Sequence, residues 1–314
     1  MNFTLVPEEP PSDSMRRIAA EQIEGAIAQL RRKDDLNEGI HEARKHFKRI
    51  RALLRLARGG LSPETYDSEN QFFRDLGRQL SPVRDSAVYI ETLDLIRNRY
   101  SAQLADESYL RLRERLVSEH RAVLNEFTRD VEQQELLFHT LQRAKPRAND
   151  WKYYESEFSL FRSGLRRIYG RGRAEKAAAL AQPTTERFHA WRKRVKYLWH
   201  HLQVLLPLWP GQLRVLARNC DRLADRLGEE HDLAVLLETP VVKSMVDTDS
   251  EGALRLFSVA SRERERLRRA AIPLAQRIYV ESAGRFVDRM EGYWLAYRPH
   301  THFLPHGFSG RGEQ

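Results

Sequence analysis

The sequence contains the same basic helical pattern twice, and this repetition restricts the fold more than any other feature. The first copy begins at His41 and reads H-x-x-R-K-x-x-K, and the second begins at His189 with the same spacing, 148 residues later. In each copy the cations recur at helical spacing beside a stripe of apolar residues, which is typical of an amphipathic α-helix. Each helix therefore presents one apolar face for packing and one strongly basic face.

A second pair of matched segments follows the two basic helices. Residues 76–93 match residues 223–240 at an offset of 147, with leucines, an Asp and an Ala-Val pair in common. Two matched blocks at nearly one offset indicate an internal duplication of a helical unit. Basic helices related in this way can face each other across a pseudo-twofold axis and form one continuous positive channel.

The charge pattern indicates an anionic ligand. Cations this close on one helix face repel each other by roughly a few tenths of a kcal/mol per pair. The whole chain carries a net charge of +9 and has a pI of about 9.7. Such a balance favours polyanions, which here means nucleic acid, an anionic membrane or polyphosphate.

The remaining composition restricts the class of protein. Cys220 is the single cysteine, so no disulfide can form within the chain and a reducing compartment is favoured. No apolar run of about 18 residues and no signal-type N-terminus are found, so we expect a cytoplasmic protein that does not span a membrane. Alternating strand patterns are absent, and the fold is therefore expected to be all-α.

The order of apolar stripes, caps and proline breaks predicts two tandem antiparallel bundles of the four-helix type. A flexible tail or a strap is expected over residues 1–13, followed by a first bundle over residues 14–145. A linker at 145–150 leads to a second bundle over residues 151–297, and residues 298–314 are expected to be irregular.

Several helix boundaries are predicted within these bundles. Ser14 is expected to cap the first helix, and one long helix is expected over residues 107–145. Separate helices are expected over residues 211–227 and 229–246. The last helix is expected to run over residues 251–297 with a kink at Pro273.

These motifs resemble the CHAD family, the conserved histidine α-helical domains. The resemblance rests on the motif helices at His41 and His189 and on the flanking pairs Arg84-Asp85 and His231-Asp232. The basic run over residues 166–173 is also similar, and the likeness covers about residues 14–297. It implies paired helical bundles around a central basic cavity, inorganic polyphosphate as the ligand, and targeting of some members to polyphosphate granules. No catalytic activity is implied.

Some members of this family carry a further triphosphatase domain of the CYTH type, with an E-x-E-x-K signature. The nearest string in this sequence, at Glu263 to Leu267, lacks the lysine and lies in a region with a helical pattern. The chain thus resembles a standalone member, and no cofactor or metal is expected.

The candidate ligand-binding residues are the cations and histidines of the two motifs, together with arginines on their continuation and on the preceding helices. Arginine suits this role because its guanidinium group can contact two phosphate oxygens at once. The predicted polyphosphate-binding residues are His41, Arg44, Lys45, Lys48, Arg51, Arg55, His189, Arg192, Lys193, Lys196, Arg16, Arg17, Arg171 and Arg173.

Alternatives remain open for some of these residues. The four arginines on the preceding helices are as compatible with a solvated face as with a cavity lining. His41 and His189 can donate to phosphate or can hydrogen-bond a neighbouring helix to orient the basic stripe. Arg84-Asp85 and His231-Asp232 are expected to pair across helices and to hold the basic residues.

Two other functions are compatible with the sequence. A helical nucleic-acid-binding protein is supported by the pI alone, and single-strand binders place exposed aromatic residues among their cations. Phe47 and Phe188 instead lie on the apolar stripes, although Trp191, Tyr197 and Trp199 are not excluded. An enzyme acting on phosphoanhydrides is a weaker alternative, because no metal-binding carboxylate set is identifiable. A homo-oligomer is left open.

Overall fold

The computed structural model describes residues 3–6, 8–32, 34–104 and 107–297. Over these ranges the chain forms twelve α-helices, two short 3-10 helices and no strand, which confirms the all-α prediction. In the first half the elements are α1 (Pro11–Leu30), α2 (Leu36–Leu56), η1 (Arg58–Gly60), α3 (Pro63–Gln79), α4 (Ser81–Arg99), α5 (Glu107–Arg129) and α6 (Val131–Asn149). In the second half they are α7 (Ser159–Ala181), α8 (Thr185–Val204), η2 (Leu206–Leu208), α9 (Pro210–Glu238), α10 (Pro240–Thr248), α11 (Ser250–Ile278) and α12 (Ala283–Tyr297).

The two basic segments form α2 and α8, each with a side-chain cap at its N-terminus. The Asp35 side chain accepts a hydrogen bond from Glu38 N, and the Thr184 side chain accepts one from Arg187 N. The predicted apolar stripes are buried in both helices, at Ile40, Phe47, Ile50 and Leu54 in α2 and at Phe188, Val195, Leu198 and Leu202 in α8. Because the apolar stripes face the core, the basic residues of α2 and α8 lie on the other faces of these helices.

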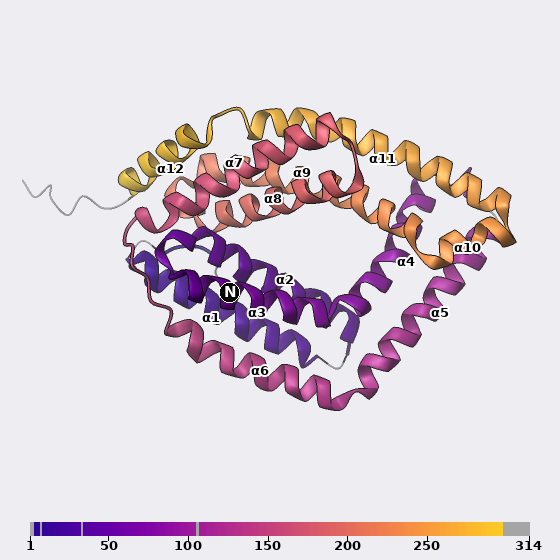
Figure 1. Ribbon diagram of the computed structural model, residues 1–314, viewed down its shortest axis with the longest axis horizontal. Helices are drawn as coiled ribbons and strands as arrows, with labels where there is room; N and C mark the ends of the chain where they lie inside the picture. The colour runs from indigo at the N-terminus through magenta and orange to yellow at the C-terminus, as the bar shows by residue number, and fades with distance from the viewer. Residues whose placement is uncertain (1–2, 7, 33, 105–106, 298–314) are drawn as a thin grey trace, which may run out of the picture.

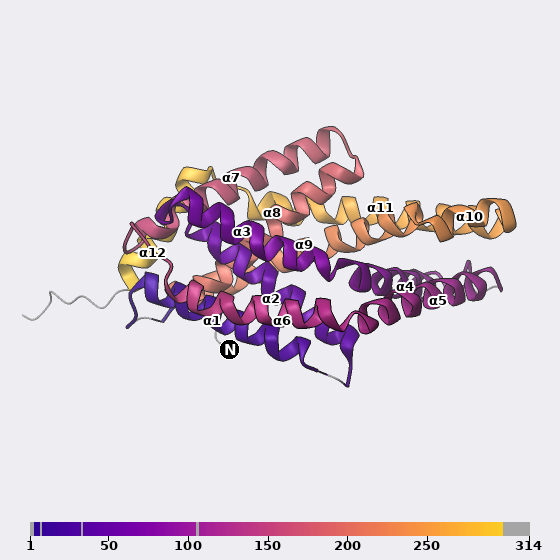
Figure 2. The ribbon, with the colours of Figure 1, turned by 60° about the horizontal axis from the view of Figure 1, so that its bottom comes forward.

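Helix α2 lies at the centre of the molecule. It packs against α1, α3, α7 and α8, and α8 in turn packs against α7 and α9. Figure 1 shows α2 and α8 near the middle, with α4 and α5 extending to one side and α10 and α11 extending to the same side. Figure 2 shows the two extensions as separate arms. Contacts of α4 with α9 and of α5 with α10 join them.

The apolar core consists of two clusters, and both halves of the sequence contribute to each. The larger cluster includes Phe47 of α2 and Trp191 of α8. The smaller cluster lies in the arms and includes Leu93 of α4 and Leu233 of α9. The core therefore does not divide at the predicted boundary between residues 145 and 151, and the tandem-bundle organisation with its pseudo-twofold axis stays a prediction.

A buried ion network also joins the two arms. The fully buried carboxylate of Glu263 accepts hydrogen bonds from Arg99 and from Tyr100 (2.7 Å), both at the end of α4, and from Arg266 (2.7 Å). Burial alone would raise the pKa of Glu263, but the donors Arg266 and Tyr100 and the charge of Arg99 lower it to about 2. Arg99 also bonds Glu229 of α9 at 3.0 Å. These contacts hold α4 against α9 and α11.

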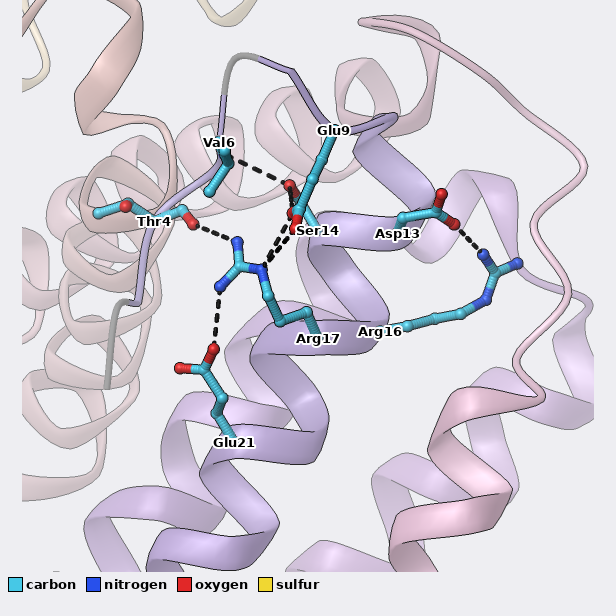
Figure 3. Close-up of polar contacts among 8 residues, drawn as sticks. All are labelled: Thr4, Val6, Glu9, Asp13, Ser14, Arg16, Arg17 and Glu21. Atoms are coloured by element: carbon cyan, nitrogen blue, oxygen red, sulfur yellow. Dashed lines mark hydrogen bonds and ion pairs between the residues drawn. The ribbon is translucent and has the colours of Figure 1, made fainter.

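The N-terminal segment is a strap, which is one of the two predicted forms, and the expectation of a flexible tail is wrong for its described part. Leu5 is buried, and its N–H donates to Val204 O of α8 at 2.9 Å. Helix α1 begins at Pro11, so Ser14 is not its cap. Ser14 instead donates to Glu9 (2.7 Å) and accepts from Val6 N (3.3 Å), which fastens the strap to α1 (Figure 3).

Three further boundary predictions are wrong. The expected helix over 107–145 is broken at Asp130, whose side chain accepts from Gln133 N at 2.9 Å and starts a new helix. Helix α6 then continues through Pro146, so the connection between the halves lies at 150–158. Helix α9 is continuous across residue 228.

The final predicted helix is also divided. Helix α11 continues through Pro273 to Ile278, and the break follows at 279–282 before α12 begins. The predicted irregular tail, residues 298–314, lies outside the described residues.

We expect Gly164→Ala to destabilise the protein strongly. A Cβ at this position in α7 would lie 2.1 Å from Leu56 O and 2.5 Å from Arg55 O, and backbone atoms of α2 cannot move aside cheaply. Overpacking of this kind costs about 1–3 kcal/mol and occasionally more. Chemical denaturation followed by circular dichroism measures the change.

Gly292→Ala is the matched control, because a Cβ at Gly292 in α12 meets nothing within 4 Å. This variant should be stabilised by about 0.5–1 kcal/mol, since Ala loses less conformational entropy than Gly in a helix. Equal stability of the two variants would contradict the close packing of α7 on α2.

Candidate functional site

The basic faces of α2 and α8 converge on one group of cations. We define the central cation cluster as Arg44 and Lys48 of α2, Arg84 of α4, and Arg192 and Lys196 of α8. All four of the other cations act on the ammonium group of Lys48. Four of these residues were predicted from the repeated motif, and the structure brings both copies together.

Lys48 occupies an unusual position in this cluster. Its side chain is exposed to solvent, and yet protein surrounds it closely enough that burial, followed by the charges of its cationic neighbours, lowers its pKa to about 8. Burial and neighbouring positive charge both disfavour an ammonium ion. Within the described part of the chain no carboxylate forms an ion pair with Lys48. Lys48 is therefore an accessible cation that forms no ion pair with a described carboxylate.

Arg44 is held in place by the turn between α3 and α4. Its Nη1 donates to Gly77 O at 2.5 Å and to Ser81 Oγ at 2.6 Å, and its Nη2 lies 3.8 Å from Asp85 Oδ1. The side chain is only 14% exposed, and burial lowers its pKa. The predicted pairing across helices is thus confirmed for Asp85, whereas Arg84 bonds Glu91 of its own helix at 2.6 Å.

The second half supplies the corresponding Arg and Lys with different neighbours. Arg192 lies over Gly228 of α9, where a Cβ would come within 3.3 Å of its Nε. The carboxyl of Asp232 lies in the same region, and burial raises its pKa although Arg192, Arg84 and Lys48 act to lower it. The glycine at position 228 therefore allows α9 to approach Arg192 closely.

The continuation of the α2 stripe lies against α3 and α8. Arg51 Nε and Arg55 Nη1 donate to Asn70 Oδ1 at 3.3 and 2.7 Å. The Arg55 guanidinium lies 4.3 Å from the ring centroid of Tyr197, a cation–π distance. Burial lowers the pKa of Arg51, and Arg55 is among the cations that lower it further.

Sequence analysis missed Arg194, which lies in the same region. Burial lowers its pKa, and the charge of Arg171 acts in the same direction. The motif does not include Arg194, because His46 stands at the equivalent position of the first copy. Arg171 itself is exposed on α7. Arg194 is half-buried and lies 3.9 Å from Glu175, and no sequence pattern marks it.

The motif histidines differ in their surroundings. His41 is half-buried, and burial followed by the charge of Arg84 lowers its pKa. His189 packs against His231 of α9 with ring centroids 4.0 Å apart and an angle of 31° between the planes. Burial and nearby cations lower the pKa of His189 to about 4 and that of His231 to about 3. Both rings are therefore neutral at neutral pH.

The two remaining motif lysines lie at the edge of the cluster. Lys45 Nζ pairs with Glu42 Oε1 at 2.6 Å. Lys193 is exposed on α8, and its charge contributes to the lowered pKa values of His189 and His231. Neither residue is among the cations that act most strongly on Lys48.

Three of the predicted arginines have structural roles instead of lining the site. Arg16 donates to Trp151 O (2.9 Å) and Asp13 (2.6 Å), and Arg17 binds Glu9, Glu21 and Thr4 O. Figure 3 shows that Arg17 holds the N-terminal strap to α1. Arg173 donates to Glu281 O. Carbonyl groups of distant segments engage Arg16 and Arg173, and Arg16 and Arg17 also pair with carboxylates one helical turn away.

The described residues offer neither a metal site nor a membrane span. No group of three or more His, Cys, Asp or Glu side chains among them is placed to hold a metal ion. None of the helices in the described ranges is long and apolar enough to cross a bilayer. Cys220 is buried, and burial raises its pKa above the usual range, so it is a packed thiol.

These features define an all-helical protein in which two repeated basic helices meet at one cationic cluster. The CHAD domain profile matches residues 17–239, and the chain therefore belongs to the CHAD family. Among curated proteins, no sequence relative matches the chain.

Two solved structures share the fold. PptA from Streptomyces chartreusis superposes with a TM-score of 0.57 at 14% identity, over 87% of this chain and 100% of that chain. The CHAD domain from the plant Ricinus communis superposes with a TM-score of 0.55 at 17% identity, over 94% of this chain and 95% of that chain. At these identities the likeness concerns the fold alone.

We expect Lys48 to be the most reactive lysine of the basic helices toward an amine-acylating reagent at pH 8. It is exposed, and with a pKa of about 8 roughly half of its side chains are neutral at that pH. Labelling is measured over pH 6–10 by mass spectrometry of the peptides, and the pH at which the rate of Lys48 labelling is half-maximal gives its pKa. Lys152, exposed in the connection between the halves, is the reference residue. If Lys48 reacts no faster than Lys152 at pH 8, its crowding by cations is contradicted.

Proposed function

We propose that this protein binds inorganic polyphosphate, without catalysis, at the central cation cluster. The observation that carries the proposal is Lys48, an accessible ammonium group on which four other cations act and which forms no ion pair with a described carboxylate. Polyphosphate is a flexible chain with negative charge along its whole length. Its recognition requires many cations on ordered elements and no acid–base pair.

The arrangement of the cluster suits such a ligand. Charge-assisted hydrogen bonds to phosphate oxygens are about twice as strong as neutral ones. The release of counterions from the polymer adds affinity that decreases as the salt concentration rises. The guanidinium of Arg44 is already fixed by Gly77 and Ser81, so little side-chain entropy is lost when an anion binds beside it.

A concave site is supported by the surroundings of Lys48. Lys48 is open to solvent and nearby protein still lowers its pKa, a combination that fits a depression better than a convex surface. Arg51 and Arg55 extend the cationic stripe from there along α2 toward Arg194. We infer a basic cavity of this shape, in agreement with what membership of the CHAD family implies. Binding of this kind would place the protein in the cytoplasm, on polyphosphate granules.

Binding of nucleic acid is the less favoured alternative. Base stacking needs exposed aromatic faces among the cations. Phe47, Phe188 and Trp191 are buried in the core. The ring of Tyr197 lies under Arg55 at 4.3 Å, and that of Trp199 lies under Lys196 at 4.4 Å. Three aromatic residues of the basic helices are therefore buried, and the partly buried rings of Tyr197 and Trp199 each already have a cation over one face.

The double variant Lys48→Glu with Lys196→Glu should abolish binding of long-chain polyphosphate. Two charge reversals at the centre of the cluster replace attraction by repulsion, and both side chains lie on the solvent-facing side of their helices, so the helical content should not change. We expect the affinity to fall at least about a hundredfold, because the variant loses roughly two ionic contacts with the polyanion and adds two repulsive charges. Calorimetric titration and circular dichroism provide the two readouts.

Lys152→Glu with Arg214→Glu is the matched control, because both residues are exposed and the change in net charge is the same. This control should lose only the small, non-specific part of the attraction. A folded Lys48/Lys196 variant that binds as well as the control would move the site to another surface.

A further inference from the structure

The duplicated halves differ in charge around the site. At an offset of 148, Arg51 and Arg55 of α2 correspond to Trp199 and Gln203 of α8. At an offset of 147, Arg74 and Arg78 of α3 correspond to Asp221 and Asp225 of α9. Four cations of the first half are thus matched by an aromatic residue, an amide and two carboxylates in the second.

The two carboxylates of α9 engage the motif lysine of the second half. Lys196 Nζ lies 3.6 Å from Asp221 Oδ1 and 3.7 Å from Asp225 Oδ1. The same ammonium group lies 4.4 Å from the ring centroid of Trp199, which stands where the first half has Arg51. An incoming phosphate must therefore compete for Lys196 with two carboxylates that belong to the protein.

The first half differs at the equivalent lysine, although Arg44 of the same helix lies 3.8 Å from Asp85. Lys48, the counterpart of Lys196, has no ion pair with a described residue. Arg74 is close enough to Arg51 to lower the pKa of that guanidinium. Arg78 follows Arg74 by one helical turn, next to Gly77, whose carbonyl binds Arg44.

The α3 arginines are themselves only partly neutralised. They share one carboxylate, that of Asp75, at 3.1 Å from Arg74 and 3.6 Å from Arg78. Their side chains are 38% and 69% exposed, so both can reach a ligand in solvent.

We propose that the two repeats have different roles: the α2–α3 face binds the polyanion, and Asp221 and Asp225 are an internal competitor that limits the contribution of Lys196. Arg74 and Arg78 are then additional ligand-binding residues that the motif does not contain. This inference rests on the proposed function, because it concerns the same site and the same ligand.

The physical consequence is a weaker and more reversible complex than the number of cations would give. Fixed carboxylates beside a bound phosphate chain repel it, and a group that already has a counter-charge releases fewer ions from the polymer on binding. Removing the competitor should therefore tighten binding and steepen its dependence on salt, whereas removing the α3 arginines should do the reverse.

The first test is the variant Asp221→Asn with Asp225→Asn, titrated with long-chain polyphosphate at several salt concentrations. The affinity should rise about threefold or more, and the slope of log K against log salt should increase by about one ionic contact. Glu132→Gln with Glu135→Gln on α6 is the control, because these exposed residues give the same change in net charge. If the α9 variant gains no more than the control, the competitor role is overturned.

The second test is Arg74→Gln with Arg78→Gln, compared with Arg214→Gln and Arg218→Gln at exposed positions on α9. The α3 variant should lose about tenfold in affinity and about two ionic contacts in its salt slope, and the α9 control should lose far less. Equal losses would overturn the binding role of α3.

Both tests presuppose that the unmodified chain binds polyphosphate. An unmodified chain that does not bind polyphosphate rejects the proposed function itself. Binding without the predicted asymmetry rejects only this inference.

Discussion

The packing of α2 against α8 is the constraint on which the rest of the site depends. At this contact the fully buried His201 of α8 donates from Nε2 to Ala52 O of α2, at 3.0 Å. Burial lowers the pKa of His201 to about 3, so the ring is neutral and its tautomer is fixed by the carbonyl it meets. Both helices bury their apolar stripes in one shared core, and this burial fixes the rotation of each helix about its own axis. Lys48 therefore comes close to Arg192 and Lys196.

Such a cluster is unfavourable without an anion, and other interactions have to stabilise the fold that contains it. The shared apolar core is the main stabilising interaction, and the network around Glu263 holds the two arms together. Like charges in a partly desolvated site repel more strongly than they do in water. A bound polyanion would remove this repulsion, so that ligand binding and stability are linked. Without a ligand, Asp221 and Asp225 relieve part of this repulsion at Lys196, and Asp85 does so at Arg44.

The sequence was sufficient to predict the helical class and the two basic helices with their apolar stripes, because helical periodicity records which face is buried. It also singled out four cations that meet in the central cation cluster, Arg44, Lys48, Arg192 and Lys196. Helix breaks were harder to predict: Asp130 ends one helix and caps the next, while Pro146 and Pro273 lie within helices that continue. Arg17 binds the N-terminal strap and Arg16 binds the backbone carbonyl of Trp151, and no local pattern reveals these contacts. Arg84 of the cluster was recognised in the sequence only as half of an ion pair, since its approach to Lys48 depends on the packing of α4.

The central claim is that the meeting of the two basic helices creates a site for a linear inorganic polyanion and not for nucleic acid. Competition calorimetry tests it most directly, with long-chain polyphosphate and a single-stranded DNA of equal total charge titrated against the unmodified protein at the same salt concentration. The account predicts that polyphosphate displaces the DNA and binds with micromolar or tighter affinity, because the cations are ordered and the aromatic rings are buried or partly buried. Preference for the DNA, or equal affinity for both polymers, would contradict it.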